Sequence, residues 1–381
     1  MTKKPSYRFA GYTESWEEKK LGEVAELLNG RAYKQEELLE DGEYRVLRVG
    51  NFNTNDRWYY SDLQLEDSKY ANYGDLLYLW ATNFGPELWK EEKVIYHYHI
   101  WKISGYSNIL DKYYFYTFLE KDKDRIKQNT NGSTMVHITK GMMEERVLTF
   151  PSLPEQTAIG SFFQDIDQLI GLQQRKLEVL KEQKKTYLKL LFPAKGQTKP
   201  ALRFAGFEDD WKEVKLGDFV EISKGIQRNK EFLSPNADSK NCYPVYNGGK
   251  QESGYTDEFN REGNIMISEG GASAGFVNYF DGKYWSGGHN FTIDELENDI
   301  YYVLALLESQ QQELYSLQVG SGLPNIQLNS LKKVIITFPA FLEQQAIGAF
   351  FQDLDKVITK QEEKVNQLKE SKQTLLRKMF I

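Results

Sequence analysis

The stretch FPSLPEQTAIGSFFQDID, from Phe150 to Asp167, returns as FPAFLEQQAIGAFFQDLD from Phe338 to Asp355, 188 residues later. A second repeat has an offset of 195 residues and relates Arg8-Phe9-Ala10-Gly11 to Arg203-Phe204-Ala205-Gly206. Each copy of this second repeat precedes a Trp-x4-Leu-Gly segment, at Trp16–Gly22 and Trp211–Gly217. Between these borders the two copies share little. The pattern predicts one scaffold, used twice, that carries two different modules.

A long helix is predicted to follow each Phe-Pro pair. From Glu155 to Phe192 the sequence contains no proline, and apolar residues recur at three- and four-residue steps. The second copy repeats this spacing as far as Met379. Heptad-like spacing sustained over about five heptads is typical of a coiled coil. Two such stripes in one chain predict an antiparallel helix pair about a pseudo-twofold axis, and two unrelated helices, each packed on its own module, are the alternative.

The segments between the helices predict modules that mix strands and helices. Strand-like runs rich in β-branched and aromatic residues include Tyr44–Val49, Val94–Ile103 and Val147–Phe150. Helices are predicted at Tyr113–Glu120 and Asp299–Leu317. The expected fold class is α+β, with two α/β-mixed modules joined by two long antiparallel coiled-coil helices. The expected boundaries are 1–150 for the first module, 151–195 for its helix, 196–338 for the second module and 339–381 for its helix.

Composition argues against several classes of protein. The 381 residues carry a net charge of −7, which does not suit a simple basic DNA-coating protein. No stretch reaches the roughly 18 apolar residues of a membrane span, and the first residues lack the apolar run of a signal peptide. One cysteine, Cys242, excludes an internal disulfide and fits a reducing compartment. We therefore expect a cytoplasmic protein without a membrane anchor.

The sequence lacks the motifs of common catalytic sites. No two of its ten prolines are adjacent, whereas an adenine methyltransferase would need a Pro-Pro pair to hold the flipped base. No dinucleotide-binding glycine loop, P-loop or His-Glu-x-x-His motif is present. His97 and His99 lie in an aromatic run without paired metal-ligand spacing, so packing is favoured over a metal site. We expect no catalysis by this chain alone, and no cofactor or metal bound to it.

Together these features resemble the DNA-specificity subunit of type I restriction–modification systems. The resemblance lies in the segment Phe-Pro-x3-Glu-Gln-x-Ala-Ile-Gly-x-Phe-Phe that opens each long helix, and in the Trp-x4-Leu-Gly segment that opens each module. It covers essentially the whole chain. It implies that each module is a target recognition domain for one half of a split DNA sequence, and that the helices space the modules and bind other subunits.

The same resemblance implies partners and cofactors. The implied partners are double-stranded DNA, two modification (methyltransferase) subunits and the restriction (helicase-nuclease) subunits. S-adenosylmethionine, ATP and Mg are expected on those partners and not on this chain. A scaffold carrying two ligand or peptide modules is the alternative function. A stand-alone nuclease or methyltransferase is disfavoured because the catalytic motifs are missing.

Polar and basic residues in loops after strand-like runs are the expected DNA contacts, because these side chains can bond to base edges. In the first module they are Arg31, Lys34, Arg48, Asn51, Asn53, Arg57, Thr82 and Asn83. In the second module they are Gln227, Arg228, Lys230, Asn247, Lys250, Ser268, Ser273 and His289. For each of them, an ordinary solvated loop residue is the alternative.

The first turns of each long helix hold the expected contacts with partner subunits. In the first copy these are Glu155, Gln156, Phe162, Phe163 and Asp167. In the second copy they are Glu343, Gln344, Phe350, Phe351 and Asp355. Packing inside the helix pair is the alternative for the phenylalanines. It is less expected for the polar residues, since their polarity gives no packing reason for the repetition.

Overall fold

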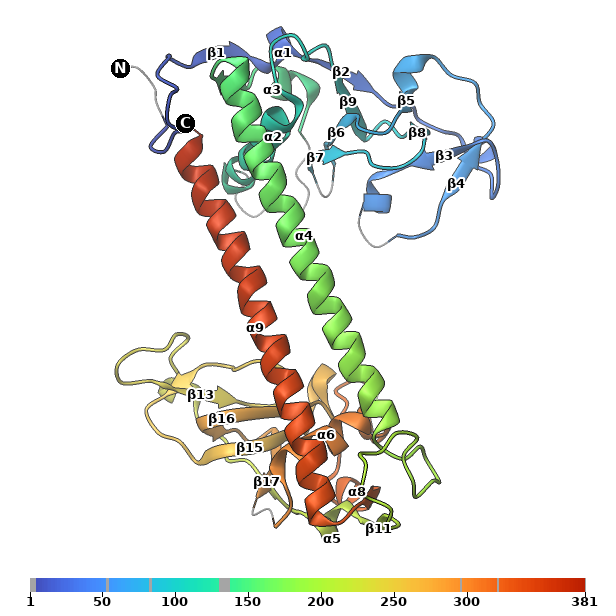
Figure 1. Ribbon diagram of the computed structural model, residues 1–381, viewed down its shortest axis with the longest axis vertical. Coiled ribbons are helices and arrows are strands. Elements are labelled where there is room, and N and C mark those ends of the chain that lie inside the picture. The colour runs from blue at the N-terminus through green and yellow to red at the C-terminus, as the bar shows by residue number, and fades with distance from the viewer. Residues whose placement is uncertain are drawn as a thin grey trace. The chain divides into compact units, whose positions relative to one another are not determined.

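The computed structural model describes residues 5–52, 55–81, 84–129, 138–294, 297–320 and 322–380. The chain forms two compact units, and both long helices run from one unit into the other (Figure 1). Unit 1 comprises residues 1–173 and 364–381, and unit 2 comprises residues 174–363. Each unit holds one module, the first half of one long helix and the second half of the other. This division differs from the four segments expected from the sequence, because each unit boundary lies within a long helix.

The module of unit 1 contains a two-stranded sheet, β1-β10, and two four-stranded sheets, β2-β9-β6-β7 and β4-β3-β8-β5. Its strands are β1 (Glu17–Lys20), β2 (Glu26–Asn29), β3 (Tyr44–Leu47), β4 (Tyr59–Ser61), β5 (Tyr70–Ala71), β6 (Leu76–Leu79), β7 (Gly85–Leu88), β8 (Val94–Tyr96), β9 (Ile100–Ser104) and β10 (Val147–Phe150). Its helices are α1 (Leu21–Val24), α2 (Lys112–Asn129) and α3 (Lys140–Glu144), with 3-10 turns η1 (Gln35–Glu37), η2 (Val49–Phe52) and η3 (Asp67–Lys69). Strand β3 runs parallel to β8.

The module of unit 2 contains the sheet β11-β18 and a six-stranded sheet, β12-β17-β15-β16-β13-β14. Its strands are β11 (Lys212–Lys215), β12 (Glu221–Lys224), β13 (Tyr243–Tyr246), β14 (Tyr255–Thr256), β15 (Arg261–Ser268), β16 (Val277–Ser286), β17 (Asn290–Asp294) and β18 (Ile335–Phe338). Its helices are α5 (Leu216–Phe219), α6 (Ile300–Ser309), α7 (Gln311–Ser316) and α8 (Leu328–Lys332), with 3-10 turns η4 (Lys230–Phe232) and η5 (Gly271–Ser273). Strand β16 is ten residues long and pairs with both β15 and β13, so one sheet replaces the two four-stranded sheets of unit 1.

The structure refines several elements expected from the sequence. Strand β10 spans the predicted Val147–Phe150. The predicted strand Val94–Ile103 is two strands, because a turn follows His97 and separates β8 from β9. The predicted helix Asp299–Leu317 is likewise two helices, α6 and α7, which meet at Gln310.

The long helices are α4 (Leu153–Leu190) and α9 (Phe341–Met379). In unit 1, Phe380 contacts Phe163 and Lys372 pairs with Asp167. In unit 2, Phe192 contacts Phe351 and Lys184 pairs with Asp355. In both units the residue numbers on one helix fall as those on the other rise. The predicted antiparallel pairing is therefore confirmed within each unit.

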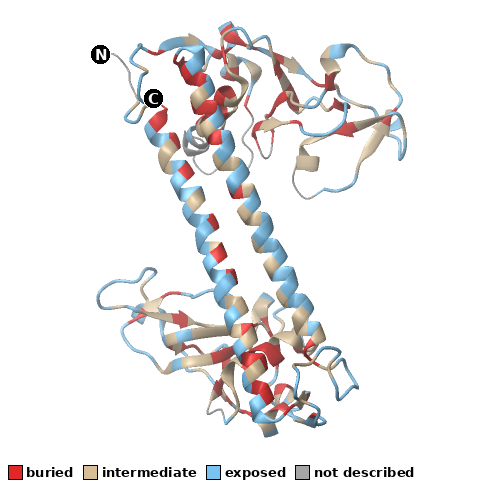
Figure 2. Ribbon diagram, viewed as in Figure 1, coloured by how far each residue is buried: buried red, intermediate tan, exposed pale blue. Residues whose placement is uncertain are grey.

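Each module completes its core with the end of a long helix that begins in the other unit. In unit 1, Phe380 packs against Trp16 and Tyr114 with ring centroids 6.5 and 5.2 Å away. In unit 2, Phe192 packs in the same way against Trp211 and Tyr302, at 6.2 and 5.6 Å. Figure 2 shows buried residues where the helices meet the modules and a largely exposed surface along the middle of α4. The apolar stripe of each helix therefore serves both helix pairing and module packing.

Candidate nucleic-acid interface

Six backbone hydrogen bonds recur at equivalent places in the two modules and tie the same loops together. In unit 1 they run from Gly30 N to Ile100 O, Arg31 N to Tyr96 O, His97 N to Leu47 O, Ile100 N to His97 O, Trp80 N to His99 O and Ile138 N to Trp80 O. In unit 2 they run from Gly225 N to Asn290 O, Ile226 N to Ser286 O, Gly287 N to Tyr246 O, Asn290 N to Gly287 O, Glu269 N to His289 O and Ile326 N to Glu269 O. We call these bonded loops the shared loop frame.

A glycine lets the loops of the frame pass at close range. A Cβ atom on Gly30 would lie 2.4 Å from the carbonyl oxygen of His97, and one on Gly225 would lie 2.1 Å from that of Gly287. Real Cβ atoms do not approach other atoms so closely, so no larger residue fits without a backbone shift. The two modules thus share a tightly constrained backbone at this place.

The side chains on the shared loop frame differ between the modules. Arg31 in unit 1 corresponds to Ile226 in unit 2, and Trp80 corresponds to Glu269. Arg48 directly follows the frame residue Leu47, and Asn247 directly follows the frame residue Tyr246. One position of the frame is histidine in both modules, as His99 in unit 1 and His289 in unit 2. Two different chemical surfaces are therefore presented on one backbone.

In unit 1, three residues predicted to contact DNA gather beside β4. The guanidinium of Arg48 lies over the ring of Tyr59, with its central carbon 4.2 Å from the ring centroid, and that of Arg57 lies 5.2 Å from the same centroid. The side-chain amide of Asn51 donates to the carbonyl oxygen of Arg57 at 3.2 Å. The Arg57 side chain is 67% exposed and lies 3.8 Å from the carboxylate of Glu40, which is 94% exposed. Because such an exposed pair is weak, Arg57 can exchange it for an outside partner.

In unit 2, three other predicted residues gather on the shared loop frame. The side-chain oxygen of Asn247 accepts a hydrogen bond from the backbone N–H of His289 at 3.2 Å. A Cβ atom on Gly288 would lie 2.9 Å from the side-chain oxygen of Gln227, so Gln227 borders the same turn. The imidazole of His289 is 62% exposed. This group is polar where the group of unit 1 is cationic.

His97 carries no charge near neutral pH. Burial lowers the pKa of His97 to about 4, and the neighbouring His99 and Arg48 act in the same direction. Its ring stacks on Tyr33 with centroids 6.4 Å apart. Among the described residues no three His, Cys, Asp or Glu side chains gather as a metal site would require. The half-buried ring of His97 therefore packs against Tyr33 in the frame, and the expectation that no metal binds there stays a prediction.

The two repeated motifs of the sequence bind each other. In unit 1, the guanidinium of Arg8 donates two hydrogen bonds of 2.6 Å to the carboxylate of Glu155 at the start of α4. In unit 2, Arg203 donates two bonds of 2.7 Å to Glu343 at the start of α9. Phe9 and Phe204, next in sequence, pack edge-on against Phe162 and Phe350. We call these residues, with Gln156 and Gln344, the helix-entry seam.

The two glutamines of the seam bind the backbone. In unit 1 the side-chain amide of Gln156 donates to the carbonyl oxygen of Pro151 at 2.8 Å, and its oxygen accepts from the N–H of Asp111. In unit 2 Gln344 donates to the carbonyl oxygen of Pro339 at 3.0 Å. These bonds hold the first turn of each long helix onto the strand that precedes it.

The model of the "Type I restriction modification DNA specificity domain" family matches residues 13–182 and again residues 208–370. The chain belongs to this family. A similar relative is the type I restriction enzyme MjaVIII specificity subunit of Methanocaldococcus jannaschii, 23% identical over 80% of this chain and 78% of that protein. A putative type I specificity subunit of Mycoplasma pneumoniae is 34% identical over 36% of each chain.

Solved structures share the fold of this specificity subunit. The S subunit of the type I restriction-modification system of Mycoplasma genitalium has a TM-score of 0.70 at 17% identity, over 100% of this chain and 99% of that one. A chain from work on complex assembly and conformational transition of the type I R-M system has a TM-score of 0.53 at 15% identity, over 96% and 97% of the two chains. Family membership makes this chain a DNA-recognition subunit of a type I system, which is not itself the enzyme.

Burial corrects part of the predicted partner surface of the specificity subunit. Glu155, Gln156, Phe163, Glu343, Gln344 and Phe351 are each at most 2% exposed. A side chain enclosed in its own unit has no surface to offer another subunit, so these six residues are structural in this conformation. Their repetition follows from the helix-entry seam and the core. Phe162, Phe350, Asp167 and Asp355 are only partly buried and stay predictions.

Burial and ion pairing also show which of the predicted DNA contacts are accessible and which are buried or already paired. Ser268 is 2% exposed inside the sheet, which corrects its assignment as a base contact. Arg31 is engaged by Glu37, and Arg228 by Asp257 and Glu258, at 2.7–2.9 Å. Lys34, Lys230 and Lys250 are exposed, Ser273 is half-buried, and all four stay predictions. Asn53, Thr82 and Asn83 lie outside the described residues.

His99 is a candidate that the sequence interpretation did not select. It occupies the same place in the shared loop frame as His289, which was selected. The signal was present in the sequence, where Lys93 and His99 have the same spacing as Lys283 and His289. The equivalence is visible in the sequence, but the aromatic surroundings of His99 favour packing over binding.

Proposed function

We propose that this chain recognises a bipartite DNA target and directs adenine methylation and DNA cleavage by partner subunits of a type I complex. The shared loop frame carries the proposal, because it places different polar groups at one position of a common backbone in each unit. Each unit would read one half of the target. A mismatched base pair costs about 1–3 kcal/mol, so two joined modules discriminate far better than one.

Catalysis is assigned to the partner subunits. S-adenosylmethionine would bind to the modification subunits, and ATP and Mg to the restriction subunits. Two modification subunits are proposed, because the two units contain the same elements at the start of a long helix. The exposed apolar residues Leu172 and Val179 on α4 and Val357 on α9 support binding of partners along the helices.

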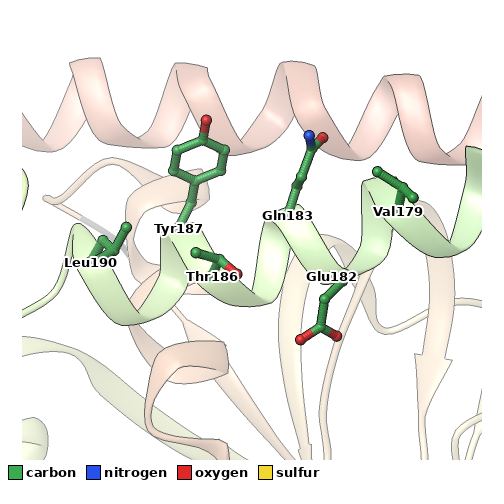
Figure 3. Close-up of a pocket in the computed structure, with 6 residues that line it drawn as sticks. All are labelled: Val179, Glu182, Gln183, Thr186, Tyr187 and Leu190. Atoms are coloured by element: carbon green, nitrogen blue, oxygen red, sulfur yellow. The ribbon is translucent and has the colours of Figure 1, made fainter.

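A groove in unit 2 adds to this surface. It has a volume of about 420 Å³ and is lined by Val179, Glu182, Gln183, Thr186, Tyr187 and Leu190, all on α4. Figure 3 shows Gln183 and Tyr187 pointing from α4 toward α9, while Glu182 points away. The groove combines apolar surface with a few polar groups, as subunit interfaces do.

The proposal is tested by sequencing methylated bases in DNA from cells that express the chain with its modification subunit. We expect one motif with methyl-adenine in two short halves separated by a fixed gap of unread bases. Cells with the modification subunit alone are the control and should show no such motif. A soluble complex that yields no new motif would contradict the proposed function.

Replacement of Arg57 by alanine should weaken binding of the assembled complex to its target by about tenfold, because a specific contact is worth about 1–3 kcal/mol. Binding is measured by titration of labelled DNA at fixed salt, since phosphate contacts depend on ionic strength. Lys90→Ala is the matched control, since Lys90 is an exposed cation of the same module that is not among the predicted DNA contacts. Equal affinities of the two variants would remove Arg57 from the interface.

A further inference from the structure

Each unit contains a lysine held between two carboxylates that come from two other helices. In unit 2, the ammonium of Lys184 on α4 lies 2.8 Å from Asp355 on α9 and 2.6 Å from Glu308 on α6. In unit 1, the ammonium of Lys372 on α9 lies 2.7 Å from Asp167 on α4 and 2.6 Å from Glu120 on α2. We call these two groups the lysine triads. All three positions repeat at the same offset of 188 residues.

The lysine of each triad is enclosed. The side chains of Lys184 and Lys372 are 15% and 10% exposed, whereas the carboxylates are 27–40% exposed. Burial alone would lower the pKa of each lysine, but the charges of the two carboxylates and their hydrogen bonds outweigh it and raise the pKa. Each lysine is therefore charged and directed at its two partners at neutral pH.

The triads join the module helix to both long helices at a place farther along them than the polar contacts of the helix-entry seam. One carboxylate comes from the paired long helix, and the other comes from the module helix, α2 or α6. The seam ties each module to the first turn of one long helix, whereas the ring packing of Phe380 and Phe192 on the modules is apolar and has little directional preference. In each triad one arm is a hydrogen bond, from Lys184 to Asp355 and from Lys372 to Glu120, and the other arm is a close ion pair. Hydrogen bonds between charged groups are directional. Three helices tied at one ammonium therefore fix the position of the module along the helix pair.

The glutamate that each module contributes to its triad is present in both modules, and this supports a role of the triads in positioning the modules. The modules differ in most of their polar residues, including those on the shared loop frame, yet Glu120 and Glu308 occupy the same place. Buried ion pairs often add little to stability, and one of their better-attested uses is to fix register. A positioning role accounts for this repetition more directly than stability does.

We propose that the two lysine triads are positioning devices that fix where each reading module sits on the helix pair, and thereby fix the length of the unread gap in the DNA target. The part of this inference that concerns the DNA gap rests on the proposed function. The part that concerns the position of the modules on the helices does not. A helix has a constant rise per residue. The helix residue that carries each module therefore helps to determine how far apart the two half-sites can lie.

Placement is tested without DNA by measuring the distance distribution between two spin labels. One label is attached to the exposed Cys242 of unit 2, and the other to Tyr73→Cys in unit 1, where the native side chain is 77% exposed. Glu120→Gln with Glu308→Gln should broaden the distribution, because the amide loses the charge that holds the lysine. Asp165→Asn with Asp353→Asn is the control on exposed acids of the same helices and should leave the width unchanged.

The gap is tested with the full chain assembled with its modification subunit, on targets whose gap is one base pair shorter or longer. We expect Glu120→Gln with Glu308→Gln to reduce the preference for the natural gap by about tenfold, because one charged hydrogen bond and one close ion pair are lost, with the same bases read in each half. Asp167→Asn with Asp355→Asn releases the other arm of each triad and should act similarly. It provides a second variant if the first is poorly folded.

The outcomes separate this inference from the proposed function. A wild-type complex without a bipartite target would contradict the proposed function, and the spin-label widths would still decide the placement role. Unchanged widths in both variants would overturn the triads as positioning devices. So would a uniform loss of methylation at every gap length, since that result indicates only reduced stability.

Discussion

Replacement of Arg203 by alanine should lower the free energy of unfolding of unit 2 by about 3–5 kcal/mol, the usual cost of stranding one member of a buried ion pair. The carboxylate of Glu343 is 1% exposed and receives two hydrogen bonds from Arg203 at 2.7 Å. Without the guanidinium, a buried charge at the start of α9 would lose its partner. The same reasoning applies to Arg8 and Glu155 in unit 1, where Glu155 is fully buried.

The measurement is urea denaturation of the full chain, combined with hydrogen exchange of the first turns of α9 to assign the loss to unit 2. Lys199→Ala is the control, because Lys199 pairs with Asp210 on the surface, where both side chains are more than 60% exposed. Exposed pairs contribute about 0–1 kcal/mol. The double variant Arg203→Met with Glu343→Leu should lose less than Arg203→Ala. A loss below about 1 kcal/mol for Arg203→Ala would contradict the importance of the helix-entry seam.

The seam shows what the sequence could and could not reveal. Both repeated motifs were visible, but their offsets differ, and Arg8 and Glu155 are far apart in the chain. From the sequence alone, a repeated polar residue at a helix start therefore indicates a surface for a partner. Only the fold shows that the arginine of one motif neutralises the glutamate of the other.

The helices were predictable for a different reason. Apolar spacing is a local property, so the long helices and strands such as β3, β10 and β15 followed from the sequence. Other strands, among them β2, β13 and β17, were not among the predicted runs. The single six-stranded sheet of unit 2 could not be predicted from the sequence. It forms because β16 is one continuous strand, whereas in unit 1 the equivalent segment is broken into β7 and β8, which belong to two different sheets. The candidate DNA contacts were predictable only in part. Loop position was predictable, but the burial of Ser268 and the ion pairs of Arg228 depend on packing.

Replacement of Gly348 by alanine should destabilise unit 2 by about 2–3 kcal/mol, because the new methyl group overpacks a close contact and disturbs a helix cap. A Cβ atom on Gly348 would lie 2.1 Å from the side-chain oxygen of Asp299 and 2.8 Å from the nitrogen of Tyr302. Asp299 caps α6 by accepting a hydrogen bond from the N–H of Tyr302 at 2.9 Å. The glycine therefore lets the start of α6 rest directly on α9.

Gly171→Ala is the matched control for this prediction. Gly171 lies inside α4 with no heavy atom within 4 Å of the added Cβ position, so alanine there should stabilise the chain by about 0.5–1 kcal/mol through helix propensity. The two glycines thus predict effects of opposite sign for the same substitution, each measurable by urea denaturation. Gly160→Ala should resemble Gly348→Ala, since its Cβ would lie 2.6 Å from the nitrogen of Tyr114. Stabilisation by Gly348→Ala would mean that α6 and α9 are not in close contact, and the place of the second module on its helix would have to be reconsidered.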